Sequence, residues 1–390
     1  MIIPFYITMI VVCVLGISLF LTFFLYLLNP KHKLPWVVIL VPFLVIGFWL
    51  SFYFLYHPLP GTNYGIYPLV KAAYIEHFGL LFGFVLAIPF LFVFAFCSWL
   101  AKRAADKKSL EFQDSRRTLL RTAAVAVPLM TMGGSAVAAY HGEKELLITH
   151  EHFMFHNLPS FLKDYKIAQI SDVHIGAFID MDDFDQVMQK VLKEKPNRLF
   201  ITGDLIDDIS RLSDLQYKLR YYAEFFPDGI DYIYGNHEHY RDYKAVKKAL
   251  EDTPIHIMDN ESIRIHGGDE PVYLVGVNYD MTRTEASRRT MLDKAMKQVP
   301  EHAFVILLAH HPENFDLAIE RRIPLTVCGH THGGQMVIAG QSLVPVGTPY
   351  FKGRYDHGDS SCYVNSGAGH WYPVRINCPR EVTFFTFGEK

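Results

Sequence analysis

Five short apolar runs in the second half of the chain each end in a polar turn that carries Asp, Asn or His. The turns are Ser171-Asp172-Val173-His174, Thr202-Gly203-Asp204, Gly235-Asn236-His237-Glu238, Ala309-His310-His311-Pro312 and Gly329-His330-Thr331-His332-Gly333-Gly334. In open α/β sheets, ligands bind outside the carboxyl ends of the strands, so turns at these ends meet along one edge. The pattern therefore predicts an α/β fold that gathers these polar side chains into one site.

The stretches around these turns alternate between predicted strands and helices. Strands are predicted at 165–170, 198–201, 230–234, 272–277, 303–309, 324–328 and 381–387, and helices at 182–195, 212–226, 243–251 and near 285–298. Strands that alternate with helices favour an α/β architecture with at least one largely parallel sheet. We expect this globular domain to cover residues 145–390.

Spacing within the turns supports a shared site. Asp172 and His174 are two residues apart, so an extended chain directs both side chains to the same face. His330 and His332 repeat this spacing. Glycine beside these residues, as at Gly235, permits a tight turn and lets the backbone approach a ligand closely.

The order of these turns resembles the calcineurin-like metallophosphoesterase family, whose pattern is Asp-x-His, Gly-Asp, Gly-Asn-His-Asp/Glu, a lone His and Gly-His-x-His. The chain is most similar to the bacterial membrane-anchored branch with Gly-His-Thr-His-Gly-Gly-Gln, here Gly329–Gln335. A closing Pro-x-Arg-x-Asn-x-Pro segment at Pro373–Pro379 also fits that branch. The resemblance covers roughly Tyr165–Phe387 and implies a β-sandwich of two sheets flanked by helices, with two metals bridged by one carboxylate.

The resemblance also implies a role for each residue of the pattern. One metal would take Asp172, His174, Asp204 and His332, and the other would take Asp204, Asn236, His310 and His330. His237 would be the catalytic histidine beside the leaving group. Mixed N and O ligands suit two divalent ions of Mn, Fe or Zn, between which the sequence does not decide. His239 and His311 flank the site, and we do not expect them to be ligands.

The chain departs from that branch at Asn365-Ser366-Gly367, where relatives usually carry Arg before the Gly. A substrate contact supplied there is either missing or replaced by Arg354, His357 or His370, although an ordinary loop position is the favoured interpretation of each. Asp207 and Asp208 have two interpretations. A solvated helix start is favoured over hydrogen bonds to ligand imidazoles.

The expected function is metal-dependent hydrolysis of phosphoesters. A phosphodiesterase or pyrophosphatase would act near the membrane through a hydroxide that bridges two metals. His237, as an imidazolium, would protonate the leaving alkoxide. The alternative is a membrane sensor or scaffold with a structural metal site. The formal net charge of −3 gives no electrostatic case for nucleic acid, which is not an expected partner.

Residues 1–140 have a different pattern, that of a membrane region with three or four transmembrane helices. Ile2–Leu28, Pro35–Tyr56 and Phe78–Leu100 carry no charge and are long enough to cross a bilayer core of about 30 Å. Thr122–Tyr140 is a weaker candidate, rich in Ala, Gly and Thr. It follows Arg116-Arg117, which looks like a twin-arginine export signal, but an Ala-rich linker or surface helix is the alternative.

Basic residues predict the orientation of these spans. Seven Lys and Arg lie between residues 102 and 121, which places that loop in the cytoplasm. We expect 122–140 to span, so that the catalytic domain of this multi-pass protein lies outside the bacterial cytoplasmic membrane; the alternative is that it stays cytoplasmic on three spans. A phosphoester linked to lipid is the leading substrate class, since the site is tied to the bilayer. The aromatic loops Pro349–Phe351 and Trp371–Tyr372 either lie at a membrane interface or pack against their own domain.

The five cysteines form no Cys-x-x-Cys pair, so zinc-finger and thioredoxin-type functions are unsupported. Cys362 and Cys378 could form a disulfide in an oxidising compartment. The sequence does not give their distance, and free thiols are the favoured interpretation.

Overall fold

The computed structural model describes residues 144–390, apart from 177, 267–269 and 371–374, together with scattered residues between 89 and 142. The chain divides into two units after His141. The predicted spans at 2–28 and 35–56 lie outside the described residues, and those at 78–100 and 122–140 are described only in part. Among the residues that are described, none of the helices combines the length and apolar character that a bilayer crossing requires.

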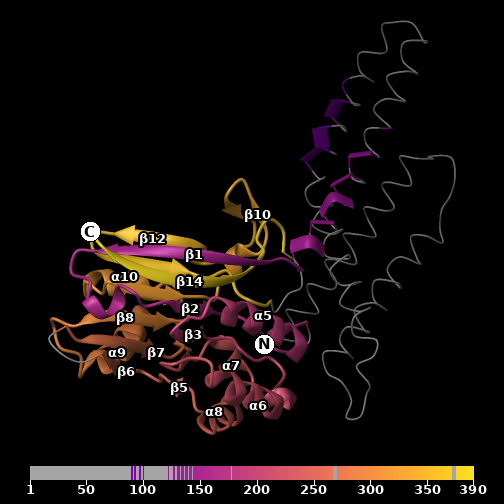
Figure 1. Cartoon of the computed structure of the whole chain (residues 1–390). Helices are drawn as coiled ribbons and strands as arrows, with labels where there is room; N and C mark the ends of the chain where they lie inside the picture. The colour runs from indigo at the N-terminus through magenta and orange to yellow at the C-terminus, as the bar shows by residue number, and fades with distance from the viewer. Residues whose placement is uncertain are drawn as a thin grey trace, which may run out of the picture. The chain divides into compact units, whose positions relative to one another are not determined.

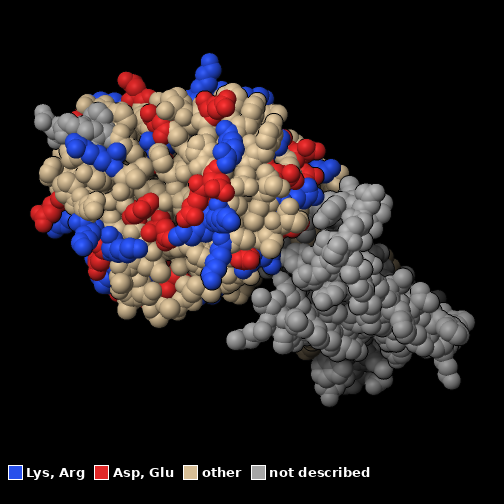
Figure 2. Space-filling view, turned by 90° about the horizontal axis from the view of Figure 1, so that it is seen from below, with Lys and Arg blue, Asp and Glu red and all other residues tan. Residues whose placement is uncertain are grey.

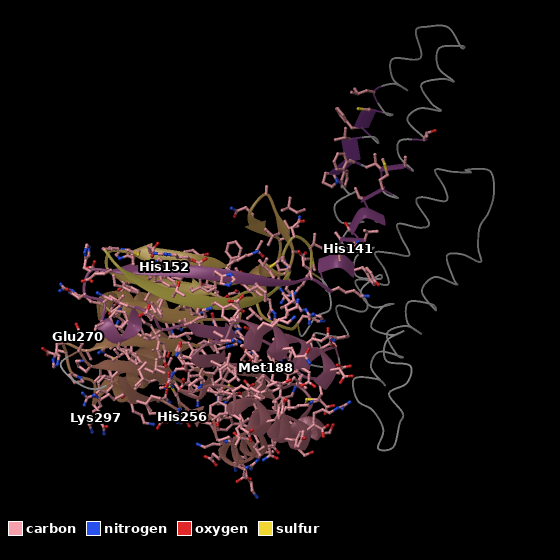
Figure 3. All side chains as sticks on the ribbon, viewed as in Figure 1. His141, His152, Met188, His256, Glu270 and Lys297 are labelled. Carbon is pink, nitrogen blue, oxygen red and sulfur yellow. The ribbon has the colours of Figure 1, made fainter. Side chains whose placement is uncertain are left out.

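Two six-stranded sheets form the centre of the second unit (Figure 1). The first has the order β1 (Leu146–Phe155), β14 (Arg380–Glu389), β2 (Ile167–Ile170), β3 (Arg198–Thr202), β4 (Ile230–Ile233) and β5 (His256–Ile257). Strands β2 to β5 run parallel, and β14 pairs antiparallel with β2 and parallel with β1. His152 of β1 and His256 of β5, labelled in Figure 3, belong to the two edges of this sheet.

The second sheet also has parallel strands at its centre. Its order is β12 (Gly353–His357), β13 (Ser360–Val364), β9 (Leu325–Cys328), β8 (Phe304–Ala309), β7 (Val272–Val277) and β6 (Glu261–His266). The four central strands are parallel, and β12 and β6 run antiparallel at the edges. A small hairpin of β10 (Val337–Ile338) and β11 (Gln341–Ser342) stands apart. The expected parallel pairing is confirmed for the central strands of both sheets. Antiparallel strands beside them make both sheets mixed.

Helices cover the outer face of each sheet. Helices α5 (Met181–Lys193), α6 (Leu212–Ala223) and α8 (Tyr243–Glu251) pack on the first sheet, and α9 (Glu285–Met296) and α10 (Asn314–Glu320) on the second. The shorter elements are α7 (Asn236–Tyr240), η2 (Ser160–Leu162), η3 (Ile209–Arg211) and η4 (His332–Gly334). The layers follow the sequence prediction of two sheets flanked by helices.

Strand β8 shows why these layers form. The even-numbered residues of Phe304–Ala309 lie in the core between the two sheets, and the odd-numbered ones pack against α9 and α10. Successive side chains of a strand point to opposite faces, so a strand buried on both sides needs apolar residues throughout. The run Phe-Val-Ile-Leu-Leu-Ala meets this requirement.

Three buried cysteines are free thiols. The disulfide considered between Cys362 and Cys378 is absent, because both are unpaired. The Cys378 thiol contacts the carbonyl oxygens of His332 and Gly333 at 3.3 and 3.4 Å. Cys362 lies on β13, beside the strand that ends in Cys328.

One buried ion pair joins β3 to β4. Arg198 Nη1 lies 2.7 Å from Asp231 Oδ2, and the two side chains are only 7% and 0% exposed. The Tyr165 hydroxyl accepts a further hydrogen bond from Arg198 Nε at 3.2 Å. On the face of the molecule in Figure 2, Lys and Arg are instead interspersed with Asp and Glu in contact with solvent. Exposed pairs contribute little to stability, whereas removal of one partner from a buried pair leaves an uncompensated charge.

We predict that Asp231→Asn lowers the free energy of unfolding by about 3–5 kcal/mol. Urea titration of the purified chain measures this change. Glu389→Gln is the matched control, because Glu389 pairs with Lys163 at 2.8 Å with both side chains 51% exposed. It should leave the urea midpoint unchanged. Equal losses in the two variants would contradict the role of burial.

Candidate metal centre

The five polar turns meet at the carboxyl ends of strands from both sheets. Asp172 and His174 follow β2, Asp204 follows β3, Asn236 begins α7 after β4, His310 follows β8, and His330 and His332 follow β9. All seven predicted ligands therefore lie at one edge of the sandwich. Six of them are buried, and His330 is half-buried.

The backbone of this site is strained. Five of these residues have positive φ: Asp172 at 51°, His174 at 54°, Asp204 at 52°, His330 at 72° and His332 at 49°. The extended conformation expected at Asp172 and His174 is thus wrong. Left-handed backbone is unfavourable for residues other than glycine and persists where the surroundings impose it, which is common at functional sites.

A first group of candidate ligand atoms comes from Asp172, His174 and His332, whose atoms lie within 4.8 Å of one another. The Nε2 atoms of His174 and His332 face each other at 3.1 Å. His332 Nε2 lies 3.5 Å from Asp172 Oδ1. The pKa of His332 is held well below its usual value by burial, by His174 and by Arg375. Neutral imidazole is the form that binds metals.

A second group consists of Asp204, His310 and His330. His310 Nδ1 donates to the Thr202 carbonyl oxygen at 2.7 Å, which directs Nε2 into the site. Nε2 lies 3.1 Å from Asn236 Oδ1 and 3.3 Å from Asp204 Oδ2. Burial lowers the pKa of His310, but the Asp204 carboxylate outweighs burial and raises it to about 10. The carboxylate and amide oxygens around His310 Nε2 favour a positive charge at this point, which a bound divalent cation would supply in place of the proton.

Asp204 lies between the two groups. Its Oδ2 atom is 3.3 Å from His310 Nε2 and 3.7 Å from His174 Nε2, so one carboxylate oxygen faces both. Gly235 makes this approach possible, because a Cβ there would lie 2.2 Å from Asp204 Oδ1. Burial raises the pKa of Asp204, but His310 and His237 reverse this and hold it well below the usual value. Asp204 is thus an anion that both groups share.

Glu238 fixes this arrangement through hydrogen bonds from backbone N–H groups. Its buried carboxylate accepts backbone N–H groups from Gly235 at 2.8 Å, Asp204 at 3.0 Å and Leu205 at 2.7 Å. The turn after β3 is thereby fixed to the turn after β4. Sequence analysis gave this residue no role, although Glu three residues after a helix N-cap is the signature of a capping box.

Arg375 is a second residue that sequence analysis missed. It comes from the closing segment Pro373–Pro379, and its side chain is fully buried. It donates to the carbonyl oxygens of Gly369 at 2.6 Å, Ser366 at 2.8 Å and Cys378 at 3.2 Å, and Nη2 lies 3.2 Å from His332 Nδ1. Arg375 thus ties three loops together behind His332.

His237 stands beside the first group. Its backbone N–H donates to Asp204 Oδ1 at 2.8 Å, and its Nδ1 lies 2.5 Å from Asp207 Oδ1. Burial lowers the pKa of His237, but Asp207 outweighs burial and raises it to about 9. The ring packs edge-on against His174, with centroids 4.4 Å apart. The Asp207 carboxylate therefore favours the protonated, imidazolium form of His237.

Asp207 is not the solvated residue that the sequence favoured. Its side chain is only 9% exposed; Oδ2 lies 3.3 Å from His174 Nδ1, and Oδ1 contacts His237 and Arg241. His174, Asp207 and His237 form a third set of atoms within 4.8 Å, but Asp207 already pairs with both rings. Asp208 does begin a helix, since its carboxylate accepts the Ser210 N–H as the N-cap of η3.

The remaining candidates have other partners, although the His311 ring stacks on that of His330 with centroids 3.6 Å apart. His239 Nε2 contacts Asn278, and His311 Nδ1 contacts Glu313. Arg354 pairs with Asp356 on β12 and stacks over the Phe153 ring, so it is an ordinary residue of that edge.

The other loop candidates also have local surroundings. His357 is exposed at the end of β12, and His370 is buried near the Phe178 ring. The Tyr350 hydroxyl donates to Asp316, so this aromatic loop packs on its own domain. Trp371 and Tyr372 lie outside the described residues.

We predict that Glu238→Gln weakens metal binding about 10- to 100-fold, because an amide nitrogen replaces one acceptor of backbone N–H groups behind Asp204. Titration of the metal-depleted chain with Mn²⁺ measures this affinity. Glu270→Gln is the control, because Glu270 (labelled in Figure 3) accepts the Ser160 N–H at an exposed loop. Unchanged Mn²⁺ affinity in Glu238→Gln would show that the Glu238 contacts do not position Asp204.

The calcineurin-like phosphoesterase family model matches residues 165–334. An uncharacterized metallophosphoesterase of Helicobacter pylori is 30% identical over 57% of this chain and 59% of its own length. A Bos taurus protein, "Transmembrane protein with metallophosphoesterase domain", is 27% identical over 73% of this chain and 66% of its own. Phosphodiesterase YaeI of Escherichia coli is 25% identical over 57% of this chain and 84% of its own length. The chain thus spans 59% of the Helicobacter relative. Residues 165–334 are thus similar to the calcineurin-like phosphoesterase family.

Proposed function

We propose that this domain is a metal-dependent hydrolase of phosphoesters, acting as a phosphodiesterase or pyrophosphatase. The observation that carries the proposal is the position of Asp204 Oδ2, which faces ligand groups on both sides. A shared carboxylate between two sets of N and O ligands is the arrangement expected of a dinuclear centre. The name of the Escherichia coli relative, a phosphodiesterase, supports the same reaction class.

The ligand assignment follows the two groups. One ion would be held by Asp172, His174, Asp204 and His332, and the other by Asp204, Asn236, His310 and His330. This donor set suits Mn, Fe or Zn. Two such ions would offset the charge of the phosphate and supply a nucleophile at neutral pH.

His237 is proposed as the general acid. Asp207 holds the ring through Nδ1 and keeps it protonated, so Nε2 carries a proton that a leaving oxygen can take. The backbone N–H of His237 also fixes Asp204. The acid and the shared carboxylate are therefore positioned by the same short helix.

The purified chain should hydrolyse bis(4-nitrophenyl) phosphate with added Mn²⁺, and chelation should abolish the reaction. Asp204→Asn removes the shared charge, so we expect fewer than two metals per chain and a rate at least about 10²-fold lower. Asp208→Asn, a neighbouring carboxylate outside both groups, should behave as wild type. Full metal occupancy without hydrolysis of any phosphoester would favour the alternative, a sensor or scaffold with a structural metal site.

We predict that His237→Ala retains both metals but slows turnover by about 10²–10⁴-fold for esters with alkyl leaving groups. The loss should shrink for nitrophenyl esters, which depart without a proton. Rates for an alkyl and a nitrophenyl ester of the same phosphate test this. The acid role fails if both substrates lose the same factor.

The proposal extends to the membrane. Residues 1–140 would form three or four spans, with the domain outside the bacterial cytoplasmic membrane and its substrate linked to lipid. The support is the uncharged stretches, the seven basic residues between 102 and 121, and the Bos taurus relative named a transmembrane protein.

Alkaline phosphatase fusions after Lys108 and after Glu145 test this orientation. We expect the enzyme to be active only in the second fusion, because segment 122–140 would carry it across. Inactivity after Glu145, with a cytoplasmic reporter active there, would place the domain in the cytoplasm. Lipid precursors of that compartment would then become the leading substrates.

A further inference from the structure

An arc of aromatic rings runs from His237 to His330. Ring centroids are 5.8 Å apart between His237 and Tyr240, and 6.2 Å between Tyr240 and Tyr279. The arc continues from Tyr279 to His311 at 5.1 Å and from His311 to His330 at 3.6 Å. It therefore joins the proposed acid to the second ligand group. Tyr240 is 41% exposed, so solvent reaches this part of the arc.

Arg283 closes the arc with an unusual set of contacts. Its Nε donates to the Tyr279 hydroxyl at 3.0 Å, and its Nη2 donates to the Tyr240 hydroxyl at 2.7 Å. The two hydroxyl oxygens are 3.2 Å apart. The Arg283 side chain is thus held in place by neutral groups.

No carboxylate of the described residues offsets the Arg283 charge within ion-pair distance, whereas two other arginines, Arg289 and Arg241, are paired. Arg289 contacts Glu285 and Glu320. Arg241, the other arginine near His237, contacts Asp207. Arg283 therefore offers a positive charge that the described protein does not neutralise.

The hydroxyl groups add donors to this charge. Burial, together with the Tyr240 contact, raises the pKa of Tyr279 to about 12, so the hydroxyl keeps its proton at neutral pH. A guanidinium with neutral hydroxyls beside it matches the geometry and charge of a phosphate group.

Building on the proposed function, we propose that Arg283, Tyr240 and Tyr279 form an anion subsite that binds a second phosphate of the substrate. Tyr240 of this subsite lies next to His237, the proposed acid, with ring centroids 5.8 Å apart. The substrate class that fits both sites is a diester of diphosphate. A simple phosphodiester contains one phosphate, which would lie at the metal centre, so Arg283 would have no anion to bind.

The reaction is hydrolysis of the P–O–P linkage. The oxygen of water bonds to the phosphorus at the metal centre, and the bond from that phosphorus to the bridging oxygen breaks. The bridging oxygen leaves with its electron pair on the second phosphate, where the Arg283 charge stabilises it. Water supplies one proton to each monoester product, so no other reactant is needed.

The test compares two nitrophenyl substrates on the purified, Mn²⁺-loaded full chain. These are bis(4-nitrophenyl) phosphate and P1,P2-bis(4-nitrophenyl) diphosphate, with products separated by chromatography. We expect Arg283→Met to lower kcat/KM about 10- to 100-fold for the diphosphate and less than twofold for the monophosphate diester. Arg283→Lys should recover part of the loss. The control variant Arg289→Met should match wild type on both substrates.

Calorimetric binding of inorganic pyrophosphate and of phosphate gives a readout independent of turnover. Arg283→Met should weaken pyrophosphate about 10- to 100-fold and leave phosphate unchanged. Equal effects on both substrates and both anions, or no effect on either, would overturn the subsite while the phosphoesterase proposal stands. Wild-type chain that hydrolyses neither substrate would instead overturn the proposed function.

Discussion

The position of one carboxylate, Asp204, governs the site. Its Oδ2 atom faces imidazoles on both sides, its Oδ1 accepts the His237 N–H, and its own N–H is bound by Glu238. A buried anion is unfavourable unless it is paired and hydrogen-bonded, and each of these contacts meets that need. Because these partners come from the turns after β2, β4 and β8, the two sheets must keep their relative register for the site to exist.

Strained backbone and close packing of the turns both shape the candidate metal site. Left-handed backbone at Asp172, His174 and Asp204 directs their side chains inward at a conformational cost. Glycine at 329 permits equally close approach, since a Cβ there would lie 2.4 Å from Asp172 Oδ2. Attraction between the ligand groups and cations would offset this cost, so the stability of the domain should be linked to metal binding.

Much of this could be predicted from sequence, for identifiable reasons. Central strands such as Phe304–Ala309 are continuous apolar runs, and their turns carry chemically distinctive residues. Strand Leu146–Phe155 was missed because it is an edge strand with polar positions, and its pairing with Arg380–Glu389 spans most of the domain. Strand Ser360–Val364 was missed because it has no run of large apolar residues.

Residues whose roles depend on distant partners were equally hidden. Arg375 is a charged residue in a loop by sequence, and only the fold shows that it is buried among carbonyl groups behind His332. Asp207 looks like a helix start until His174 and His237 are brought to it from other strands. The Arg283 contacts with Tyr240 and Tyr279 likewise join segments that local sequence patterns do not connect.

The most direct test of the account is the number and spacing of bound ions. Anomalous scattering from crystals of the Mn²⁺-loaded chain would locate them. The account predicts two peaks about 3.5–4 Å apart, with the Asp204 carboxylate bonded to both. A single peak, or a peak among His174, Asp207 and His237 with Asp204 unbound, would contradict it.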